Sequence, residues 1–485
     1  MALSRRELLA SGAAVAAGPT TPTGPATATR TLRGTIPPGA PDWVYVPLDV
    51  PPAVRELRVS YTYDRPPVPP GTPGNALDIG LFDQRGTALG GSGFRGWSGG
   101  ARGGFFVRAD AATPGYLPGP TGPGRWFLAL GPYTVAPQGL AYEVTATFVY
   151  GDPAPAAAPA YPPQRAQGRG RAWYRGDCHL HSVHSDGRRE PAELAALARA
   201  AGLDFINSSD HNTHAAHGVW GPVAAAHPEL LVLTGEEVTT RTGHVLAVGT
   251  DPGTFVDWRY RARDRRFDRF ARRIRGAGGL VVPAHPHANC IGCAWKFGFA
   301  EADAVEVWNG PWTPDDEVAL ASWDATLRGG GERWLPLVAG SDYHRDPDRV
   351  GFPQTVVLAD ELSREAVLAG LRAGRSYGAE SSAVSVAFDA VTTLGAHAGI
   401  GGRLHAPEDT QVLVRLSCTG ADGCELRLVT DQGTALTAAA DRPLQWRTTA
   451  ARTSYVRAEV RHPAAAPPLP GPPAALTNPI WLGGP

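Results

Sequence analysis

Residues 176–187 read GDCHLHSVHSDG, and a strand-like run leads into them. Side chains alternate between the two faces of an extended strand, so His179 and His181 point the same way while Leu180 points into the packing. Two imidazoles on one face can bind one ion of zinc, manganese or iron, whereas calcium and magnesium prefer oxygen ligands. The stretch therefore predicts a metal site at the end of a strand.

Residues 172–380 continue with strand-like apolar runs that alternate with helical stretches, such as 191–201 and 315–328, each followed by a glycine. This alternation predicts a parallel α/β sheet or barrel. Eleven of the 14 histidines fall between His179 and His344, and most of them follow a strand-like run. Because the carboxyl ends of the strands in a parallel barrel meet on one face, these side chains are expected to converge. The candidate metal ligands are His179, His181, Asp186, His211, Glu237, His244, His285, Asp342 and His344.

In combination and order, these motifs resemble the polymerase and histidinol phosphatase (PHP) family, and they look most like its branch of carbaryl-hydrolase-like metallohydrolases. The resemblance covers about residues 172–380. It implies an α/β fold with a distorted, TIM-like (β/α)7 barrel. It also implies two or three divalent metal ions (zinc, manganese or iron) at the carboxyl ends of the strands. The further matching motifs are Ser209-Asp210-His211-Asn212, Gly235-Glu236-Glu237-Val238-Thr239-Thr240 with Gly243-His244, Ala284-His285-Pro286, Val305-Glu306-Val307-Trp308-Asn309 and Gly340-Ser341-Asp342-Tyr343-His344-Arg345.

The resemblance also implies how the ligands divide among the ions. Glu237 would bridge the first two ions, although a shift of one residue would exchange it for Glu236. A water bound between two cations loses its proton near neutral pH and becomes a nucleophile, while the neighbouring ion withdraws charge from a phosphoryl or carbonyl oxygen. The first ion would be held by His179, His181, Glu237 and Asp342, the second by Glu237, His244 and His285, and the third by Asp186, His211 and His344.

Three residues besides Glu237 are candidates for a role in catalysis. Asp210, next to His211, could orient a ligand, with helix capping or a surface position as the alternative. Asn309 could form a hydrogen bond with the site or could be a turn residue. Arg345 could bind a substrate phosphate or be an ordinary surface arginine.

These features predict an enzyme, a hydrolase that uses a metal-bound hydroxide on a small-molecule ester, with a phosphomonoester or phosphodiester favoured. A carboxylic or carbamate ester is the alternative substrate. A pocket formed by Arg345, Arg241 and Arg188 would favour phosphate. An apolar leaving group would be favoured by a second set of side chains, which could equally form packing between domains: Trp295, Phe297, Trp308 and Trp312. A function of another class is a cell-surface binding protein in which the barrel is only structural.

The sequence on both sides of the barrel region alternates short β-patterned runs with Gly- and Pro-rich turns. Residues 31–150 predict an N-terminal β-sandwich, and residues 381–485 predict a C-terminal β-sandwich. Residues 151–171, rich in Ala, Pro and Gly, predict a linker. We therefore expect a metallohydrolase barrel flanked by two β-sandwiches.

The composition argues against several classes of partner. The 485 residues are 43% hydrophobic and 19% charged, which is ordinary for a globular protein. With 45 basic and 46 acidic residues the net charge is −1, so a general nucleic-acid binder is not expected. The sequence also lacks an apolar run of about 18 residues, so no transmembrane segment is predicted.

The N-terminal residues look like a targeting signal. Arg5 and Arg6 precede an Ala-rich apolar stretch, and Ala26-Thr27-Ala28 offers a small-residue cleavage pattern. Residues 1–28 are therefore interpreted as a twin-arginine export signal, the alternative being a disordered basic start on a cytoplasmic protein. The expected location is extracellular, periplasmic or in the cell envelope.

The five cysteines allow at most two disulfides. Cys290 and Cys293 predict either a local disulfide or two reduced thiols. Cys418 and Cys424 are suitably spaced for a hairpin disulfide, and Cys178 is expected to be buried packing.

Overall fold

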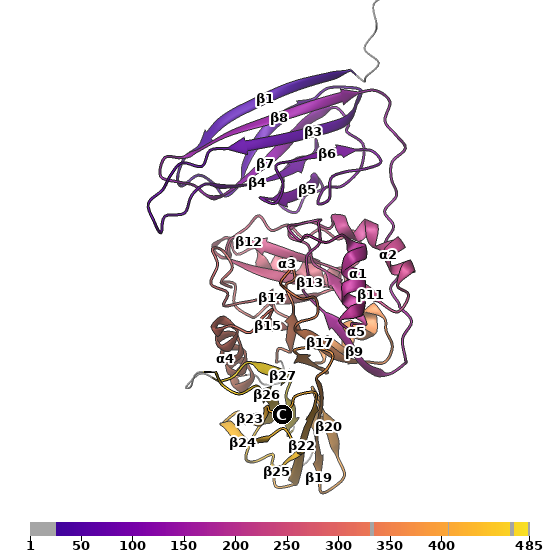
Figure 1. Cartoon of the computed structure of the whole chain (residues 1–485), viewed down its shortest axis with the longest axis vertical. Helices are drawn as coiled ribbons and strands as arrows, with labels where there is room; N and C mark the ends of the chain where they lie inside the picture. Colours follow the sequence, from indigo (N-terminus) through magenta and orange to yellow (C-terminus); the bar gives the residue numbers. More distant parts are fainter. Residues whose placement is uncertain (1–25, 330–333, 406, 466–469, 484–485) are drawn as a thin grey trace, which may run out of the picture.

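The computed structural model of the chain describes residues 26–329, 334–405, 407–465 and 470–483. Figure 1 shows three parts along the long axis: strands from residues 27–150 at one end, mixed strands and helices from residues 172–379 in the middle, and strands from residues 385–482 at the other end. The predicted export signal falls mostly on residues 1–25, which lie outside the described residues. Of the predicted cleavage pattern, Thr27 and Ala28 already belong to the first strand.

Residues 27–150 form two four-stranded antiparallel sheets, which we call the N-terminal sheet pair. Alternate side chains of both sheets meet in one apolar core that includes Leu57 and Leu128. The first sheet has the order β1 (Thr27–Ile36), β8 (Leu140–Tyr150), β3 (Val54–Tyr63), β6 (Gly104–Arg108). The second has the order β2 (Val44–Val50), β7 (Gly124–Thr134), β4 (Ala76–Phe82), β5 (Phe94–Gly99).

The strands of the middle part fall into three hydrogen-bonded groups. Parallel β9 (Ala172–Asp177), β10 (Phe205–Ser208) and β11 (Leu231–Thr234) are extended by antiparallel β17 (Gln354–Ala359) and β18 (Ser376–Ala379). A second, antiparallel group contains β12 (Glu236–Thr240), β13 (Gly243–Val248) and β14 (Leu280–Ala284). The third is the parallel pair β15 (Val305–Asn309) and β16 (Leu337–Gly340).

These strands run in mixed directions, whereas the sequence predicts a barrel of parallel strands. Only Arg241 and Thr242 connect β12 to β13, and a connection this short permits antiparallel pairing alone, since a parallel pair needs a crossover of about a dozen residues. Within the described ranges, the strands do not close into one hydrogen-bonded parallel ring.

Helices pack beside the middle strands. α1 (Pro191–Ala200) begins with a proline at its first turn, where no backbone donor is lost. α3 (Phe267–Gly276) buries Phe270 and Ile274 on one face. α5 (Arg364–Arg372) is capped by the Ser363 hydroxyl, which accepts from the Ala366 amide at 3.2 Å. The remaining helical elements are α2 (Trp220–Ala226), α4 (Pro314–Gly329) and the 3₁₀ turns Ala215–Val219 and Ala262–Asp264. In the described part of the chain, no helix is both long and apolar enough to cross a membrane.

The C-terminal strands are divided between two sheets. β20 (His397–Gly399), β19 (Ser385–Thr392), β22 (Gln411–Thr419) and β25 (Leu444–Thr449) form an antiparallel sheet of their own. β27 (Pro473–Thr477), β26 (Tyr455–Arg461), β23 (Glu425–Thr430) and β24 (Gly433–Ala439) instead continue the middle sheet, because β27 pairs with β18. β21 (Arg403–Leu404) and β28 (Ile480–Leu482) pair beside β26. The C-terminal strands therefore share a sheet with the middle part.

One of the two possible disulfides is present. Cys290 and Cys293 are bonded, and Cys178 is a buried free thiol. Cys418 and Cys424 are also free, so the predicted hairpin disulfide is wrong. Cys418 lies on β22, whereas Cys424 precedes β23 in the other sheet, where its Sγ lies 3.4 Å from Nδ1 of His462.

Candidate metal centre

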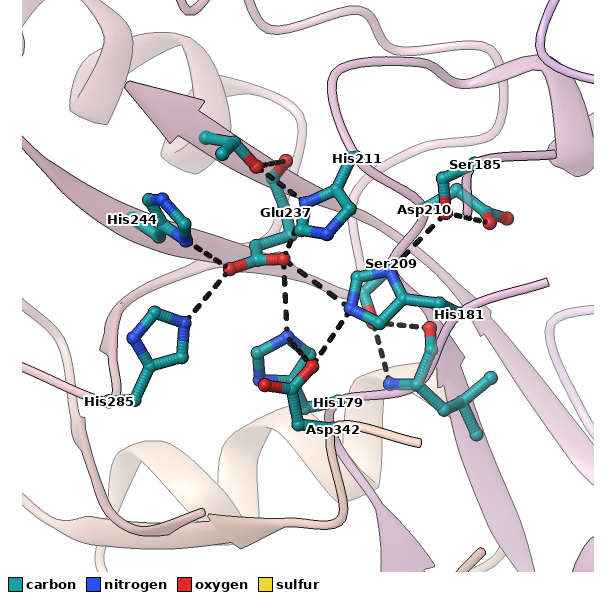
Figure 2. Close-up of polar contacts among 12 residues, drawn as sticks. His179, His181, Ser185, Ser209, Asp210, His211, Glu237, His244, His285 and Asp342 are labelled. Carbon is teal, nitrogen blue, oxygen red and sulfur yellow. Dashed lines mark hydrogen bonds and ion pairs between the residues drawn. The ribbon is translucent and has the colours of Figure 1, made fainter. Parts of the chain in front are cut away.

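The nine predicted ligands lie together in the structure. They come from loops and strand ends of all three middle groups, and Figure 2 shows most of them around the carboxylate of Glu237. Within each of three groups, the potential ligand atoms lie within 4.8 Å of one another. The groups are His179, His181, Glu237 and Asp342; Glu237, His244 and His285; and His181, Asp186, His211 and His344.

Glu237 is at the centre of this arrangement. Its Oε2 lies 3.3 Å from His179 Nε2 and 2.7 Å from His211 Nδ1. Its Oε1 lies 2.9 Å from His244 Nδ1 and 3.2 Å from His285 Nε2. Both oxygens of one carboxylate therefore contact imidazoles that come from several different segments.

The neighbouring acid points away. Glu236 Oε2 accepts a hydrogen bond from the Val256 amide at 3.0 Å, and its carboxyl group is buried. Burial raises the pKa of Glu236 well above its ordinary value. Of the two adjacent acids, Glu237 is the one that the fold brings among the imidazoles.

The donor atoms fit a divalent cation. His179 Nε2, His244 Nε2 and Glu237 Oε2 are buried and form no aligned hydrogen bond among the described residues, although Glu237 Oε2 lies within ion-pair distance of three imidazoles. Buried polar atoms without a made hydrogen bond cost free energy, so this set favours a further partner such as a cation. Imidazole nitrogen and carboxylate oxygen are the donors that zinc, manganese and iron take.

The charges in the cluster are balanced by protons on imidazoles. Burial opposes protonation of His211, but Glu237 and Asp186 outweigh it and raise the pKa of His211 to about 10. Burial likewise opposes ionisation of Glu237, yet His211 and His179 hold its pKa well below the ordinary value. Burial and the imidazoles of His344 and His211 lower the pKa of His181 to about 4. A bound cation would displace the protons on the raised imidazoles.

Two residues that the sequence analysis did not select as site residues fix the orientation of imidazoles. Glu306 Oε1 lies 2.9 Å from His179 Nδ1, and its Oε2 accepts from the His285 amide at 2.8 Å. Thr239 Oγ1 lies 2.6 Å from Nδ1 of His211. The signal for Glu306 is a charged residue inside the apolar run Val305–Asn309, because such residues are rarely buried without a partner.

The three further catalytic candidates lie in different surroundings. Asp210 accepts from the Ser182 amide at 2.9 Å and from Ser185 Oγ at 2.7 Å, so it holds the loop that carries Asp186. Asn309 Nδ2 lies 3.1 Å from Glu306 Oε2 and 3.3 Å from Asp342 Oδ2, and it therefore contacts the cluster directly.

Arg345 is different from these two. It is exposed and is not among the residues that line the pocket beside the cluster, and the same holds for Arg188. Both adjoin the candidate ligand His344, since Arg345 follows it in the chain and the Arg188 amide donates to its carbonyl at 2.8 Å, but neither lines this pocket.

Backbone strain is concentrated near the cluster. Asp342, His285 and Asn212 have φ angles of 50°, 28° and 56°. A non-glycine residue at positive φ costs about 1–3 kcal/mol and persists only where its surroundings enforce it. The fold thus accepts strain at two of the candidate ligands.

A pocket of about 420 Å³ opens beside the cluster. Asp186, His211 and His244 line it from the middle part, together with Arg241. The opposite wall comes from the N-terminal sheet pair, which the sequence analysis did not connect with the site. These wall residues include Trp43, Asp78, Trp97 and Tyr133.

The aromatic residues expected to form an apolar wall pack elsewhere. Trp295 meets Phe267 edge to face and Phe297 lies tilted against it, with ring centroids 5.1 and 5.0 Å away. Trp308 is buried in another apolar cluster and meets Trp312 edge to face. None of these four lines the pocket. Their position agrees with the packing alternative.

The other histidines of this region have mainly structural contacts. His217 Nε2 lies 2.7 Å from the Gly235 carbonyl oxygen, and its Nδ1 accepts from the Gly253 amide. His184 Nδ1 accepts from the Gly115 amide at 3.3 Å, so it joins the middle part to the N-terminal sheet pair. His214 and His287 do not line the pocket beside the cluster.

No family model and no curated protein sequence matches the chain. Among solved structures, it is similar to a two-domain protein from Bacteroides vulgatus containing a predicted PHP-like metal-dependent phosphoesterase, with 16% identity, a TM-score of 0.36, and coverage of 63% of this chain and 94% of that chain. A second similar structure is a proposed metal-dependent phosphoesterase from Bifidobacterium adolescentis, with 20% identity, a TM-score of 0.29, and coverage of 39% and 92%. A third is an amidohydrolase from Chromobacterium violaceum with bound sulfate, with 20% identity, a TM-score of 0.27, and coverage of 36% and 89%.

Proposed function

We propose that this chain is a metal-dependent hydrolase that cleaves small phosphomonoesters or phosphodiesters. The observation that supports this most strongly is the position of Glu237, whose buried carboxylate lies within 3.4 Å of nitrogens from five imidazoles, beside the pocket that His211 and His244 line. Divalent ions in such a site lower the pKa of a coordinated water and withdraw charge from an ester oxygen. The chain itself supplies the ligands, their orientation and the pocket.

Two or three ions of zinc, manganese or iron would be held by the three groups of ligand atoms. Glu237 belongs to two of these groups and would bridge them, while His181 is shared with the third. Glu306 and Thr239 hold His179 and His211 in a fixed orientation through the imidazole nitrogen that faces away from the ion.

The motifs also support finer assignments. We place residues 172–380 in the PHP family, in its carbaryl-hydrolase-like branch, with a distorted barrel between two β-sandwiches. We further propose twin-arginine export, on the basis of Arg5 and Arg6 and the Ala-rich stretch after them.

A carboxylic or carbamate ester is the second candidate substrate. Trp43 and Tyr133 line the same pocket as the ligands, and their rings could pack against an apolar leaving group. Arg241 in that pocket favours the phosphate ester.

The test uses purified protein that begins at Ala26, so that the first strand is kept. Aryl phosphate monoesters and diesters are compared with aryl acetates and carbamates, before chelation, after chelation, and after zinc, manganese or iron is restored. Chelator-sensitive release of phosphate, lost in His179→Ala, is expected. Cleavage of the acetate or carbamate alone would favour the second candidate substrate. If metal is bound and none of these esters is cleaved, the proposal of a hydrolase is wrong.

A further inference from the structure

The pocket beside the cluster is built from two parts of the chain that lie far apart in the sequence. Asp186, His211 and His244 belong to the middle part, whereas Asp78 lies on β4 and Tyr133 on β7 of the N-terminal sheet pair. A ligand that reaches the metal cluster through this pocket therefore also meets the sheet pair.

The contact between the two parts is firmly fixed. Asp42 and Arg261 form an ion pair with Oδ1 and Nη2 2.6 Å apart, and the Gly90 amide donates to Asp257 Oδ2 at 2.8 Å. Phe82 and Phe94 of the sheet pair share one apolar cluster with Val245, Trp258 and other residues of the middle part. The sheet pair therefore forms one wall of the pocket and is held there by polar and apolar contacts.

Arg241, in the turn between β12 and β13, is the arginine among the described residues that line this pocket. Its side chain is only 7% exposed, and neither Nη atom has a hydrogen-bond acceptor in the described part of the chain. The nearest acidic oxygen, Asp78 Oδ2, is 3.7 Å from Nη2, which is too long for a hydrogen bond. A buried guanidinium without acceptors is costly unless a ligand supplies them.

Two rings of the sheet pair hold this guanidinium. Its Cζ lies 4.0 Å from the ring centroid of Tyr133 and 5.1 Å from that of Trp43. Stacking occupies the flat faces of a guanidinium, whereas its hydrogen bonds form at the edge. The rings therefore orient Arg241 and leave its donors available to a planar or tetrahedral oxyanion.

Resting on the hydrolase function proposed above, we infer that the N-terminal sheet pair completes the substrate pocket and positions Arg241 to bind an oxyanion of the substrate. The substrates are then small anionic phosphate esters, and Arg241 is a specificity-determining residue. Arg345 and Arg188 take no part in this recognition.

Inorganic phosphate is the probe for the test, and calorimetry on metal-loaded and on chelated protein measures its Kd. Arg241→Gln is expected to raise this Kd about 10- to 100-fold, the usual range for losing hydrogen bonds to a charged group. Arg241→Lys keeps the positive charge but loses the paired N–H donors of the guanidinium, so its Kd for phosphate should lie between those of the wild type and Arg241→Gln. The matched control is Arg272→Gln, an exposed arginine on α3 that is paired only with Asp268.

A second variant acts in the opposite direction. Asp78→Asn removes a negative charge 3.7 Å from Nη2 and should lower the Kd of phosphate at pH 8. If Arg241→Gln does not fold by circular dichroism, Arg241→Lys and Asp78→Asn decide the question. An unchanged Kd in Arg241→Gln, or in both of the other variants, overturns the inference.

The kinetic readout separates this inference from the proposed function. KM for 4-nitrophenyl phosphate should rise in Arg241→Gln by the same factor as the Kd, with a smaller change in kcat. If ester hydrolysis does not depend on Arg241, the hydrolase function is retained and the inference about Arg241 is wrong. If phosphate binding depends on Arg241 but no ester is hydrolysed, the proposed hydrolase function is wrong and the anion-binding site is retained.

Discussion

At the scale of single residues, Glu236 and Glu237 show how one position along a strand changes the role of an acid. The two are neighbours on β12, so their side chains point to opposite faces. Imidazoles hold the pKa of Glu237 well below its ordinary value, whereas burial raises the pKa of Glu236 well above it.

This contrast predicts opposite outcomes for one conservative substitution. Glu237→Gln should lose at least about 100-fold in metal affinity, since even residues behind the ligands are typically worth 10- to 100-fold. Glu236→Gln should change little, because this side chain points away from the imidazoles and the glutamine Oε1 can still accept from the Val256 amide. Metal content after dialysis and the rate of ester hydrolysis check both variants. Equal losses of metal affinity and of hydrolysis rate in the two variants would show that Glu237 is no more important for metal binding than Glu236.

Glu306 offers a second prediction. Its carboxylate contacts His179 Nδ1 and the His285 amide at the same time, so Glu306→Gln should loosen two candidate ligands. We expect metal affinity to fall about 10- to 100-fold, measured by titration with zinc or manganese. Glu365→Gln, an exposed acid in α5, is the control. If both variants bind metal like the wild type, Glu306 does not position the ligands.

Asp78 predicts a pH dependence. Burial raises its pKa to about 6, against the opposing charges of Arg241 and His211 and with the support of Asp186. Because the folded-state pKa lies above the unfolded value of 3.8, the ionised group destabilises the fold above pH 6, and this penalty is relieved as the pH falls towards 4. Asp78→Asn should therefore stabilise metal-free protein at pH 8 by on the order of 2 kcal/mol and by much less at pH 4.

Urea denaturation of the metal-free wild type and variant at both pH values measures this difference. The same gain in unfolding free energy at pH 8 and pH 4 would show that the titration of Asp78 is not its cause.

The candidate ligands were accessible to sequence reasoning because they are polar residues at the ends of apolar runs. Neither Thr239 nor Glu306 is a polar residue at the end of an apolar run. Both act through the far nitrogen of an imidazole that another segment supplies. Asp78 and Tyr133 could not be found at all. Their role depends on where the sheet pair packs, which no local pattern in residues 27–150 encodes.

At the scale of elements, the sequence predicted where strands lie better than how they run. Buried parallel and antiparallel strands have similar apolar runs, so direction follows from the connections. The two residues between β12 and β13 fix one antiparallel pair, and this turn places Arg241 at the pocket. Pairing of β17 with β9 and of β27 with β18 joins residues far apart in the chain, which a local pattern does not predict.

The end of β16 predicts a link between strand packing and the site. A Cβ on Gly340 would lie 2.6 Å from the His179 Cβ and 2.7 Å from Glu306 Oε1. Gly340→Ala should therefore cost about 1–3 kcal/mol of stability and also weaken metal binding. In contrast, a Cβ on Gly276 of α3 meets nothing within 4 Å, so Gly276→Ala should stabilise by about 0.5–1 kcal/mol. Thermal unfolding with and without metal compares the two, and an unperturbed Gly340→Ala would contradict the close approach.

At the scale of the whole molecule, a shared sheet and a shared apolar cluster couple the parts that the sequence suggests are separate domains. The middle sheet runs on into the C-terminal strands through the β18–β27 pair. The apolar cluster around Trp258 is shared with the N-terminal sheet pair. Residues 151–160 of the predicted linker are exposed, yet their backbone bonds to both parts: the Ala157 amide donates to the Ala109 carbonyl at 3.2 Å and the Ala160 amide to the Gly218 carbonyl at 2.8 Å. A shift in composition locates a linker in the sequence. It does not report how much surface the two parts on either side of that linker bury against each other.

This coupling predicts that the described parts unfold together. Because the C-terminal strands share a sheet with the middle part and the sheet pair shares a core with it, calorimetry should show one transition whose calorimetric and van't Hoff enthalpies agree. Metal at about 100 times its Kd should shift that whole transition upwards, since binding to the folded state alone contributes about 2.7 kcal/mol. Separate transitions, or a metal-dependent shift in only one of them, would mean that the parts fold independently. In that case the sheet pair could leave the pocket without unfolding, and the wall that holds Arg241 would not be permanent.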